Sequence, residues 1–292
     1  MSATPKIGNG TEFAGSKRVD LSGAGMEWPA RALFAVLLAG IALASTFAGA
    51  PYLAGVIALV SFAASREWHR MVSPKRYFWE SMFTGAAIGS GLVAVVIAPH
   101  QLWPFGILLI GSIAAATSAL LRGAPPFLNG AGAIYIGVPS LLLVALREHS
   151  AQGALIVIAL FIVIWGADTG ALVTGRVIGG PKLVPMLSPN KTWAGFLGGI
   201  VLPAAGLAIY VTLLHGSGWK AAIFGVVLAL AAHAGDLFES WIKRRVGRKN
   251  SGSLIPGHGG ALDRIDSTLF VAPAAAVLVF LFGLDPLFGA HI

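Results

Sequence analysis

The chain has 292 residues, with 20 Lys and Arg against 12 Asp and Glu, and a formal net charge of +8. Hydrophobic residues make up 56% of the sequence and charged residues only 11%, and the mean hydropathy is +0.80. A soluble domain is about a quarter charged, and no soluble fold of this length could bury so much apolar surface. The composition therefore predicts an integral membrane protein. Because the chain has no cysteine, disulfides and thiolate metal ligands are excluded.

The first 28 residues differ from the rest of the chain. They are polar, rich in glycine and serine, and lack the pattern of a cleavable signal peptide. We predict that residues 1–28 form a disordered cytoplasmic tail and that residues 29–292 form a single transmembrane domain.

Long apolar stretches follow the tail. Runs of about 17–25 apolar residues cross a bilayer as helices, because every backbone polar group must be bonded internally. The predicted spans are Ala30–Ala48, Pro51–Ala64, Ser81–Ala98, Leu102–Leu121, Gly130–Leu146, Ala154–Thr174, Trp193–Leu214, Lys220–Leu237 and Ser267–Leu284. The predicted fold class is therefore all-α, a polytopic membrane protein of about nine transmembrane helices.

The distribution of basic residues tests this topology. If the N-terminus is cytoplasmic, 18 of the 20 Lys and Arg fall on the cytoplasmic side, and only Arg147 and Lys220 fall on the other side. This bias follows the positive-inside rule. The positive charge is thus explained by membrane topology, and we predict no nucleic-acid partner.

Five carboxylates are predicted at the cytoplasmic level of the membrane. Ionisable groups within spans are costly and usually functional, although any one of these could be a structural residue or a helix cap. They are Asp168, Asp236, Glu239, Asp263 and Asp266. Carboxylate oxygens suit Mg²⁺, which takes one or two of them together with substrate phosphate. We predict that Asp236 and Asp263 bind the metal and that Asp266 supports it. Asp168 is expected to hold a second cation or to orient a lysine.

The segment Ser240–Ser267 lies between two apolar stretches and holds six Lys or Arg and two Asp. Within it, Pro256–Gly260 is a glycine-rich turn whose backbone N–H groups can wrap an anion. The basic residues could instead anchor the loop to anionic lipid. The loop at Ser188–Trp193 has Lys191 between Ser188 and Thr192 at a helix start, which suits an anion or an ordinary cap. Together the two loops predict the handling of phosphate groups where lipid meets water.

In these segments the sequence resembles the phosphatidate cytidylyltransferase (CDP-diacylglycerol synthase) family. The matching residues are Ser240, Lys243, Arg244 and Lys249, the turn Pro256-Gly257-His258-Gly259-Gly260, and then Asp263, Arg264 and Asp266. Gly235-Asp236, Ala167–Gly170 and Ser188–Thr192 also fit the family pattern. Two positions depart from it: Asn250 stands where the family usually has Asp, and Ala194 where it often has Glu.

The resemblance implies an enzyme that makes CDP-diacylglycerol and pyrophosphate from CTP and phosphatidate with Mg²⁺. Lys243, Arg244 and Arg264 would clamp phosphates, and His258 with Gly257, Gly259 and Gly260 would cradle the triphosphate. Ser188, Lys191, Thr192, Ser240 and Lys249 would also bind substrate. The expected location is a bacterial-type inner membrane with the active site facing the cytoplasm. Membrane lipid and a second copy of the chain are further candidate partners.

Two alternatives remain open from the sequence. One is a divergent paralogue of the family with weak or altered activity, which the departures at Asn250 and Ala194 would explain. The other is an ion-coupled transporter that uses Asp168 and Asp236 as a relay. A transporter accounts for carboxylates in the membrane but not for the dense polar loop.

Overall fold

The structure is a computed structural model that describes residues 24–248, 251–252 and 260–282. Helices dominate this part of the chain. They are α1 (Ala24–Ala48), α2 (Ala50–Val72), α3 (Phe78–Ile97), α4 (Trp103–Leu121), α5 (Pro126–Glu148), α6 (Gly153–Val177), α7 (Trp193–Leu213), α8 (Gly218–Arg245), α9 (Leu262–Ile265) and α10 (Thr268–Phe282). A short hairpin of β1 (Lys182–Val184) and β2 (Ser188–Thr192) precedes α7.

All nine predicted spans coincide with helices, and the helical membrane fold is confirmed. Within the described residues, seven helices are long and apolar enough to cross a membrane by length and composition. The orientation of the N-terminus stays a prediction. Several boundaries differ from those expected, and α8 continues past its predicted end at Leu237 to Arg245. Helix α1 begins at Ala24, inside the predicted tail, whereas residues 1–23 lie outside the described part.

Another difference lies at the end of α2. Helix α2 continues eight residues past the predicted end at Ala64 and stops at Val72. The added residues include Glu67, Trp68 and His69, which are all buried against other helices. Hydropathy alone ends the span too early, because these polar groups face protein and are hydrogen-bonded there.

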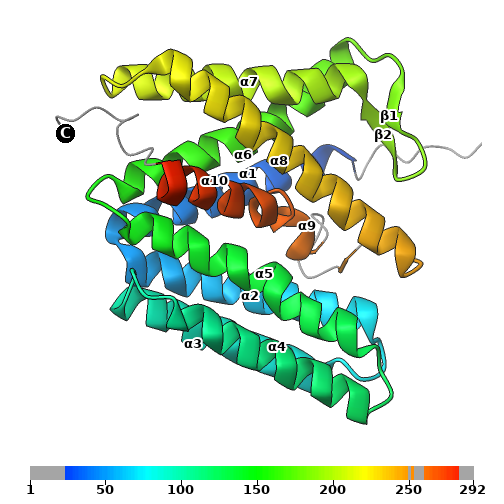
Figure 1. Ribbon diagram of the computed structural model, residues 1–292. Coiled ribbons are helices and arrows are strands. Elements are labelled where there is room, and N and C mark those ends of the chain that lie inside the picture. The colour runs from blue at the N-terminus through cyan, green and yellow to red at the C-terminus, as the bar shows by residue number, and fades with distance from the viewer. Residues whose placement is uncertain (1–23, 249–250, 253–259, 283–292) are drawn as a thin grey trace, which may run out of the picture.

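The helices form two groups, which Figure 1 shows one above the other. Helices α2, α3, α4 and α5 pack on one another in the lower group, and α6, α7 and α8 pack consecutively in the upper group. Helix α10 contacts both α5 and α8 and so joins the groups. Helix α1 packs on α2 and α6. The hairpin, α9 and the C-terminal end of α8 therefore lie at the same end of the bundle, on the right in Figure 1.

Small residues let the upper helices approach closely. A Cβ at Gly170 of α6 would lie 2.3 Å from the carbonyl oxygen of Gly198 in α7. A Cβ at Gly225 of α8 would lie 2.6 Å from the Cα of Ala204 in α7. Such contacts are typical of helices that associate in lipid, where close backbone packing replaces the hydrophobic driving force.

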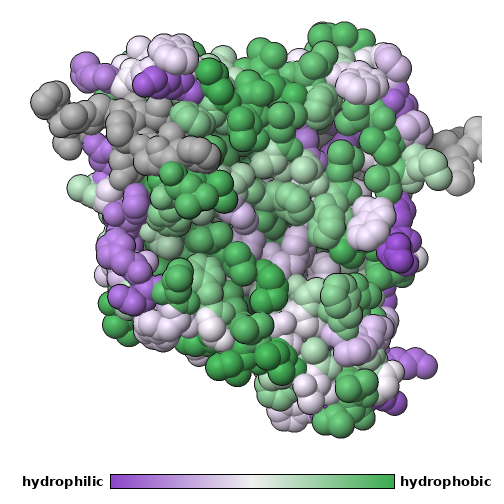
Figure 2. Space-filling model, viewed as in Figure 1, coloured by the Kyte–Doolittle hydropathy of each residue, from purple (hydrophilic) through white to green (hydrophobic). Residues whose placement is uncertain are grey.

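The outer surface agrees with a membrane environment. Figure 2 shows a broad hydrophobic area across the middle of the viewed face and hydrophilic residues toward its left and right edges, where the helices end. Large apolar side chains such as Ile110, Leu120 and Leu197 are exposed on the helices. We therefore treat the chain as an integral membrane protein.

Candidate active site

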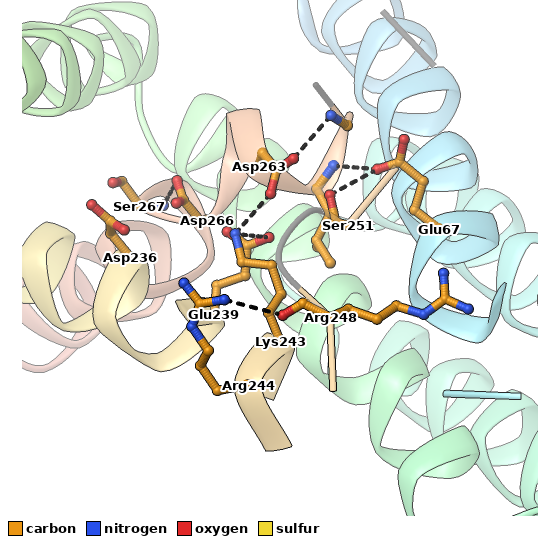
Figure 3. Close-up of polar contacts among 12 residues, drawn as sticks. Glu67, Asp236, Glu239, Lys243, Arg244, Arg248, Ser251, Asp263, Asp266 and Ser267 are labelled. Carbon is orange, nitrogen blue, oxygen red and sulfur yellow. Dashed lines mark hydrogen bonds and ion pairs between the residues drawn. The ribbon is translucent and has the colours of Figure 1, made fainter. Parts of the chain in front are cut away.

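One face of α8 carries the centre of the candidate site. Asp236, Glu239 and Lys243 are spaced by three and four residues, so they lie on the same side of the helix. Figure 3 shows this face turned toward Asp263 and Asp266, which come from the chain around α9. Two consecutive helices, α8 and α9, thus bring acidic and basic groups together.

The first group of contacts is centred on Asp236. The Lys191 Nζ donates to its Oδ2, so the hairpin is tied to α8. Asp168 of α6 lies within the electrostatic influence of Asp236, Lys191 and Arg264. Asp266 lies within that of Asp236 and Asp168. Three of the predicted metal ligands, Asp168, Asp236 and Asp266, therefore lie close enough to influence one another, and Lys191 pairs with Asp236.

Gly235 allows α8 to approach the segment that carries Asp266. A Cβ at this position would lie 2.4 Å from the backbone oxygen of Asp266, so any side chain would force the two segments apart. The close approach brings Asp236 beside Asp266 and Ser267 (Figure 3). The Ser267 backbone N–H donates to Asp266 Oδ1 at 2.7 Å, which orients that carboxylate.

The second group is centred on Lys243. Its Nζ lies 2.8 Å from Asp263 Oδ1 and 3.4 Å from Glu239 Oε1. Glu239 is only 1% exposed and Lys243 only 14%, so this cation compensates a deeply buried charge. The Gly260 backbone N–H donates to Asp263 Oδ2 at 2.9 Å. Both oxygens of Asp263 therefore have donors from the chain, unlike the arrangement expected for a residue that shares a metal with Asp236.

The remaining basic residues around the site are more accessible. Arg244 and Arg264 are exposed, and Arg244 Nη1 donates weakly to the Arg248 carbonyl oxygen at 3.5 Å. Arg245 lies over the ring of Trp241, 5.3 Å from its centroid, in a cation–π contact. Ser240 is half-buried on α8. Exposed guanidinium groups of this kind suit the binding of a polyanion.

In the hairpin, Thr192 serves as the cap of α7. Its Oγ1 accepts from the Gly195 backbone N–H at 3.1 Å, and the residue is buried. Ser188 is half-buried at the far end of β2. Ala194, one of the two departures from the family pattern, accepts a hydrogen bond from Thr174 through its backbone oxygen. Of the three residues expected in this loop, Lys191 is therefore the one that reaches the carboxylates.

Part of the predicted site lies outside the described residues. Lys249, Asn250, Gly257, His258 and Gly259 belong to this part. Their predicted roles in phosphate binding stay predictions. The described residues on either side of 253–259 are Ser251–Gly252 and Gly260.

An apolar cavity of ≈ 620 Å³ leads to the charged groups. Side chains of α1, α2, α5 and α6 line most of it, including the stacked rings of Phe161 and Trp165. Asp168, Asp263 and Arg264 line its polar end. The cavity therefore combines an apolar chamber with a charged boundary, as an amphiphilic substrate requires.

The donor set fits a hard divalent cation, although the described residues contain no group of three His, Cys, Asp or Glu side chains that forms a complete metal site. Mg²⁺ commonly uses one or two carboxylates and completes its shell with substrate phosphate and water. Asp236 and Asp266 are neighbours in this structure, with Asp168 nearby. The carboxylates of Asp236, Asp266 and Asp263 also accept from the chain: Asp236 from Lys191, Asp266 from the Ser267 N–H, and Asp263 from both Lys243 and the Gly260 N–H.

Two carboxylates at the site were given no role by the sequence. Glu239 stood among the carboxylates expected near the membrane surface. Its i,i+4 spacing from Lys243 indicates a contact only if the helix continues past the predicted end at Leu237, as α8 does. Glu67 was not singled out at all, although Figure 3 shows its carboxylate facing Ser251 beside the site. The one available signal was a glutamate three residues after the predicted span Pro51–Ala64, and it gained meaning only when α2 proved longer than expected.

Comparisons with known proteins agree with the geometry. The family model described as "Cytidylyltransferase family" matches residues 29–282. A phosphatidate cytidylyltransferase of Brucella suis is 34% identical over 262 residues, covering 87% of this chain and 92% of that protein. One of Staphylococcus epidermidis is 42% identical over 135 residues, covering 45% of this chain and 52% of that protein. The chain therefore belongs to the cytidylyltransferase family.

Proposed function

We propose that the chain transfers the cytidylyl group of CTP to phosphatidate, which yields CDP-diacylglycerol and pyrophosphate. The observation that carries this proposal is the apolar cavity that ends at Asp168, Asp263 and Arg264. Lipid chains fit its apolar part, and a phosphate head group fits the charged end. Family membership supports a nucleotidyltransferase, and the named relatives support phosphatidate as the acceptor.

The proposed reaction requires little proton transfer. A phosphate oxygen of phosphatidate attacks the α-phosphorus of CTP and forms a new P–O bond. The bond from the α-phosphorus to the oxygen that bridges to the β-phosphorus breaks, and pyrophosphate leaves with the electron pair. The attacking phosphate monoester is already ionised, so no strong general base is needed. The main obstacle is the approach of one anion to another.

The basic residues of the site address this repulsion. In our proposal Arg264 at the polar end of the cavity and Lys243 beside Asp263 contact the phosphates. Lys191 and Arg244 support the triphosphate. Asp263, through its contact with Lys243, keeps that cation aimed at the reacting groups. Asp236 and Asp266, with Asp168, hold Mg²⁺. When bound, this ion supplies positive charge to the phosphates and to the leaving pyrophosphate.

Access from two sides completes the proposal. Phosphatidate enters laterally from the bilayer between helices that line the cavity, and CTP arrives from the aqueous side. We place that side in the cytoplasm of a bacterial-type inner membrane, because basic residues gather at the end of the bundle with the hairpin and α9. Arg176, Lys182, Lys243 and Arg245 lie there, whereas Arg147 and Lys220 lie at the opposite helix ends.

The test is an assay of the purified protein in detergent micelles. We expect pyrophosphate release to require CTP, phosphatidate and Mg²⁺ together, and lipid extracts to contain CDP-diacylglycerol in equal amount. Removal of Mg²⁺ with a chelator should abolish turnover, and added Mg²⁺ should restore it. Pyrophosphate release that is independent of phosphatidate, or no release under any of these conditions, would refute the proposed reaction.

A further inference from the structure

Glu67 is a buried carboxylate that the proposed mechanism does not use. It lies near the end of α2 and is only 6% exposed. Its Oε2 accepts from the Leu262 backbone N–H at 2.9 Å and more weakly from Ser251 Oγ at 3.5 Å. Both donors belong to the segment between α8 and α10, 184 and 195 residues from Glu67 along the chain. Glu67 therefore joins the lower group of helices to the chain that carries Asp263.

The backbone encloses this carboxylate on both sides. A Cβ at Gly252 would lie 2.4 Å from Glu67 Oε1, and a Cβ at Gly260 would lie 2.4 Å from Oε2. Glycines at these two positions allow the backbone to approach the carboxylate so closely. The Glu67 carboxylate thus lies between Gly252 and Gly260, just before α9.

We propose that Glu67 is a positioning residue for cytidylyl transfer, because its carboxylate holds the start of α9 and thereby sets the position of Asp263 against Lys243. The proposal rests on the proposed function and adds a residue to it. Ala261, the N-cap residue of α9, has no side-chain acceptor, so the backbone N–H groups there need one from elsewhere. Glu67 supplies this acceptor with a charged oxygen, which makes the hydrogen bond stronger than a neutral one.

The link to the reacting groups is short. Asp263 follows Leu262 directly, and its two oxygens accept from Gly260 N and Lys243 Nζ. A rotation of the single turn of α9 would change both contacts at once. Asp263 and Arg264 also line the polar end of the cavity, so the same rotation would move groups that meet substrate.

Helix α2 is itself firmly placed. Trp68, the next residue, donates from Nε1 to the Leu128 carbonyl oxygen at 2.9 Å and packs on Gly132, where a Cβ would lie 2.4 Å from the indole ring. Its ring also contacts Tyr135, with centroids 5.1 Å apart. Glu67 therefore stands on a rigid support, as a residue that sets the geometry of a site requires.

A role in stability alone explains Glu67 poorly. A buried carboxylate carries a desolvation penalty, and a well-packed apolar side chain is often as stable or more stable in its place. Among the described residues, Glu67 Oε1 has no hydrogen-bond partner, so the penalty is only partly offset. The carboxylate provides a hydrogen-bond acceptor for the backbone beside Asp263, which an apolar side chain could not provide.

Glu67→Met and Glu67→Gln test the proposal, with Glu80→Met as the matched control. Methionine keeps the size of the side chain but removes both oxygens, whereas glutamine keeps an acceptor. Glu80 of α3 is also a fully buried glutamate with one donor, Ser118 at 2.9 Å, and one unpaired oxygen among the described residues, but it lies away from the site. All three variants are expected to remain folded in detergent.

We expect Glu67→Met to lower kcat about 100-fold, as expected for a small misplacement of reacting groups. The KM for CTP should change much less. Glutamine should restore kcat to within about tenfold of the unsubstituted protein, because a neutral acceptor is weaker but present. Glu80→Met should keep the normal kcat. Full activity of Glu67→Met, or an equal loss in Glu80→Met, would overturn the proposal.

Hydrogen–deuterium exchange provides a readout that does not depend on activity. The peptide containing Leu262 should exchange faster in Glu67→Met than in the unsubstituted protein and be unchanged in Glu80→Met. Unchanged exchange in Glu67→Met would refute the positioning role even if the proposed reaction were correct. If the unsubstituted protein fails to convert CTP and phosphatidate, the proposed function fails, and the exchange experiment still decides whether Glu67 holds α9.

If Glu67→Met does not fold, Glu67→Gln and Ser251→Ala are compared by the same exchange measurement. Glu67→Gln should then exchange faster than the unsubstituted protein, and an unchanged rate would refute the role.

Discussion

Lys243 contributes to the stability of the fold and, in our proposal, to the reaction. Its ammonium lies between Glu239, which is almost fully buried, and Asp263 at the end of the cavity. Charges interact more strongly away from water, so this cation has a large effect on both carboxylates. In our proposal the same group contacts substrate phosphate. Its two roles can be separated because Asp263 lines the cavity and Glu239 does not.

We expect Lys243→Met to abolish turnover and to lower the thermal midpoint in detergent. Removing one partner of a buried ion pair costs about 3–5 kcal/mol, because the other charge is left uncompensated. Adding Glu239→Gln should restore much of the midpoint, since the amide is neutral, but none of the turnover. The measurements are the thermal midpoint and CDP-diacylglycerol formation for both single variants and the double variant.

The control for this series is Lys220→Met at the opposite end of α8, where the ammonium lies over the Trp219 ring. It should change neither midpoint nor turnover. Recovery of turnover in the double variant would mean that Lys243 serves only as a counterion, and the proposed contact with phosphate would then be wrong.

At the scale of elements, the site depends on how closely α8 approaches the α9–α10 segment. Gly235 is the contact point, because its Cα faces the backbone oxygen of Asp266. This approach brings Asp236 beside Asp266, and the hairpin then adds Lys191 from a third element. Three elements therefore position one cluster of charges, and the spacing between backbones decides its geometry.

Gly235→Ala should lower both the thermal midpoint and the turnover. The added methyl group would lie 2.4 Å from the Asp266 oxygen, and overpacking of this kind costs about 1–3 kcal/mol. The separation of Asp236 from Asp266 should also raise the Mg²⁺ concentration needed for half-maximal activity. Gly89→Ala in α3 is the control, because no atom lies within 4 Å of its added Cβ. A normal Mg²⁺ requirement in Gly235→Ala would argue against a metal shared by Asp236 and Asp266.

At the scale of the whole molecule, α10 joins two groups of helices, and the apolar cavity lies among α1, α2, α5 and α6. Neither group alone encloses the cavity. Asp263 and Arg264, which line the charged end of the cavity, belong to α9, and Figure 1 shows α9 toward the side of the bundle that carries the hairpin. In our proposal this arrangement separates the two substrates, with the lipid in the apolar chamber and the nucleotide on the aqueous side.

Ala42→Phe, which places a ring in the apolar part of the cavity, should raise the KM for phosphatidate roughly tenfold or more by competing with lipid chains for volume. The KM for CTP should be unchanged, because Ala42 lies away from the charged end. Initial rates with each substrate varied in turn provide the measurement. Ala86→Phe on the exposed surface of α3 is the control and should leave both values unchanged. An equal rise in both KM values would indicate general distortion and contradict the assignment of the cavity to lipid.

The sequence by itself determined the membrane class, the helices and the family. Apolar stretches become helices in lipid regardless of their neighbours, because the backbone must satisfy its own hydrogen bonds there. The segment from Ser240 to Asp266 is contiguous and specific, so its resemblance required no tertiary information. Where polar residues faced protein, as at Glu67 to His69, hydropathy misplaced the end of the helix.

Only the tertiary structure decided which charges are partners. Lys191 pairs with Asp236 and Lys243 with Asp263. The metal site predicted at Asp236 and Asp263 stays a prediction. Asp263 and Asp266 are three residues apart, yet their hydrogen-bond donors differ: Asp263 accepts from Lys243 and the Gly260 N–H, and Asp266 from the Ser267 N–H. Electrostatic pairing depends on distances of a few ångströms. Those distances are set by where the backbones of α2, α8 and α9 approach one another, and no local pattern along the chain contains that information.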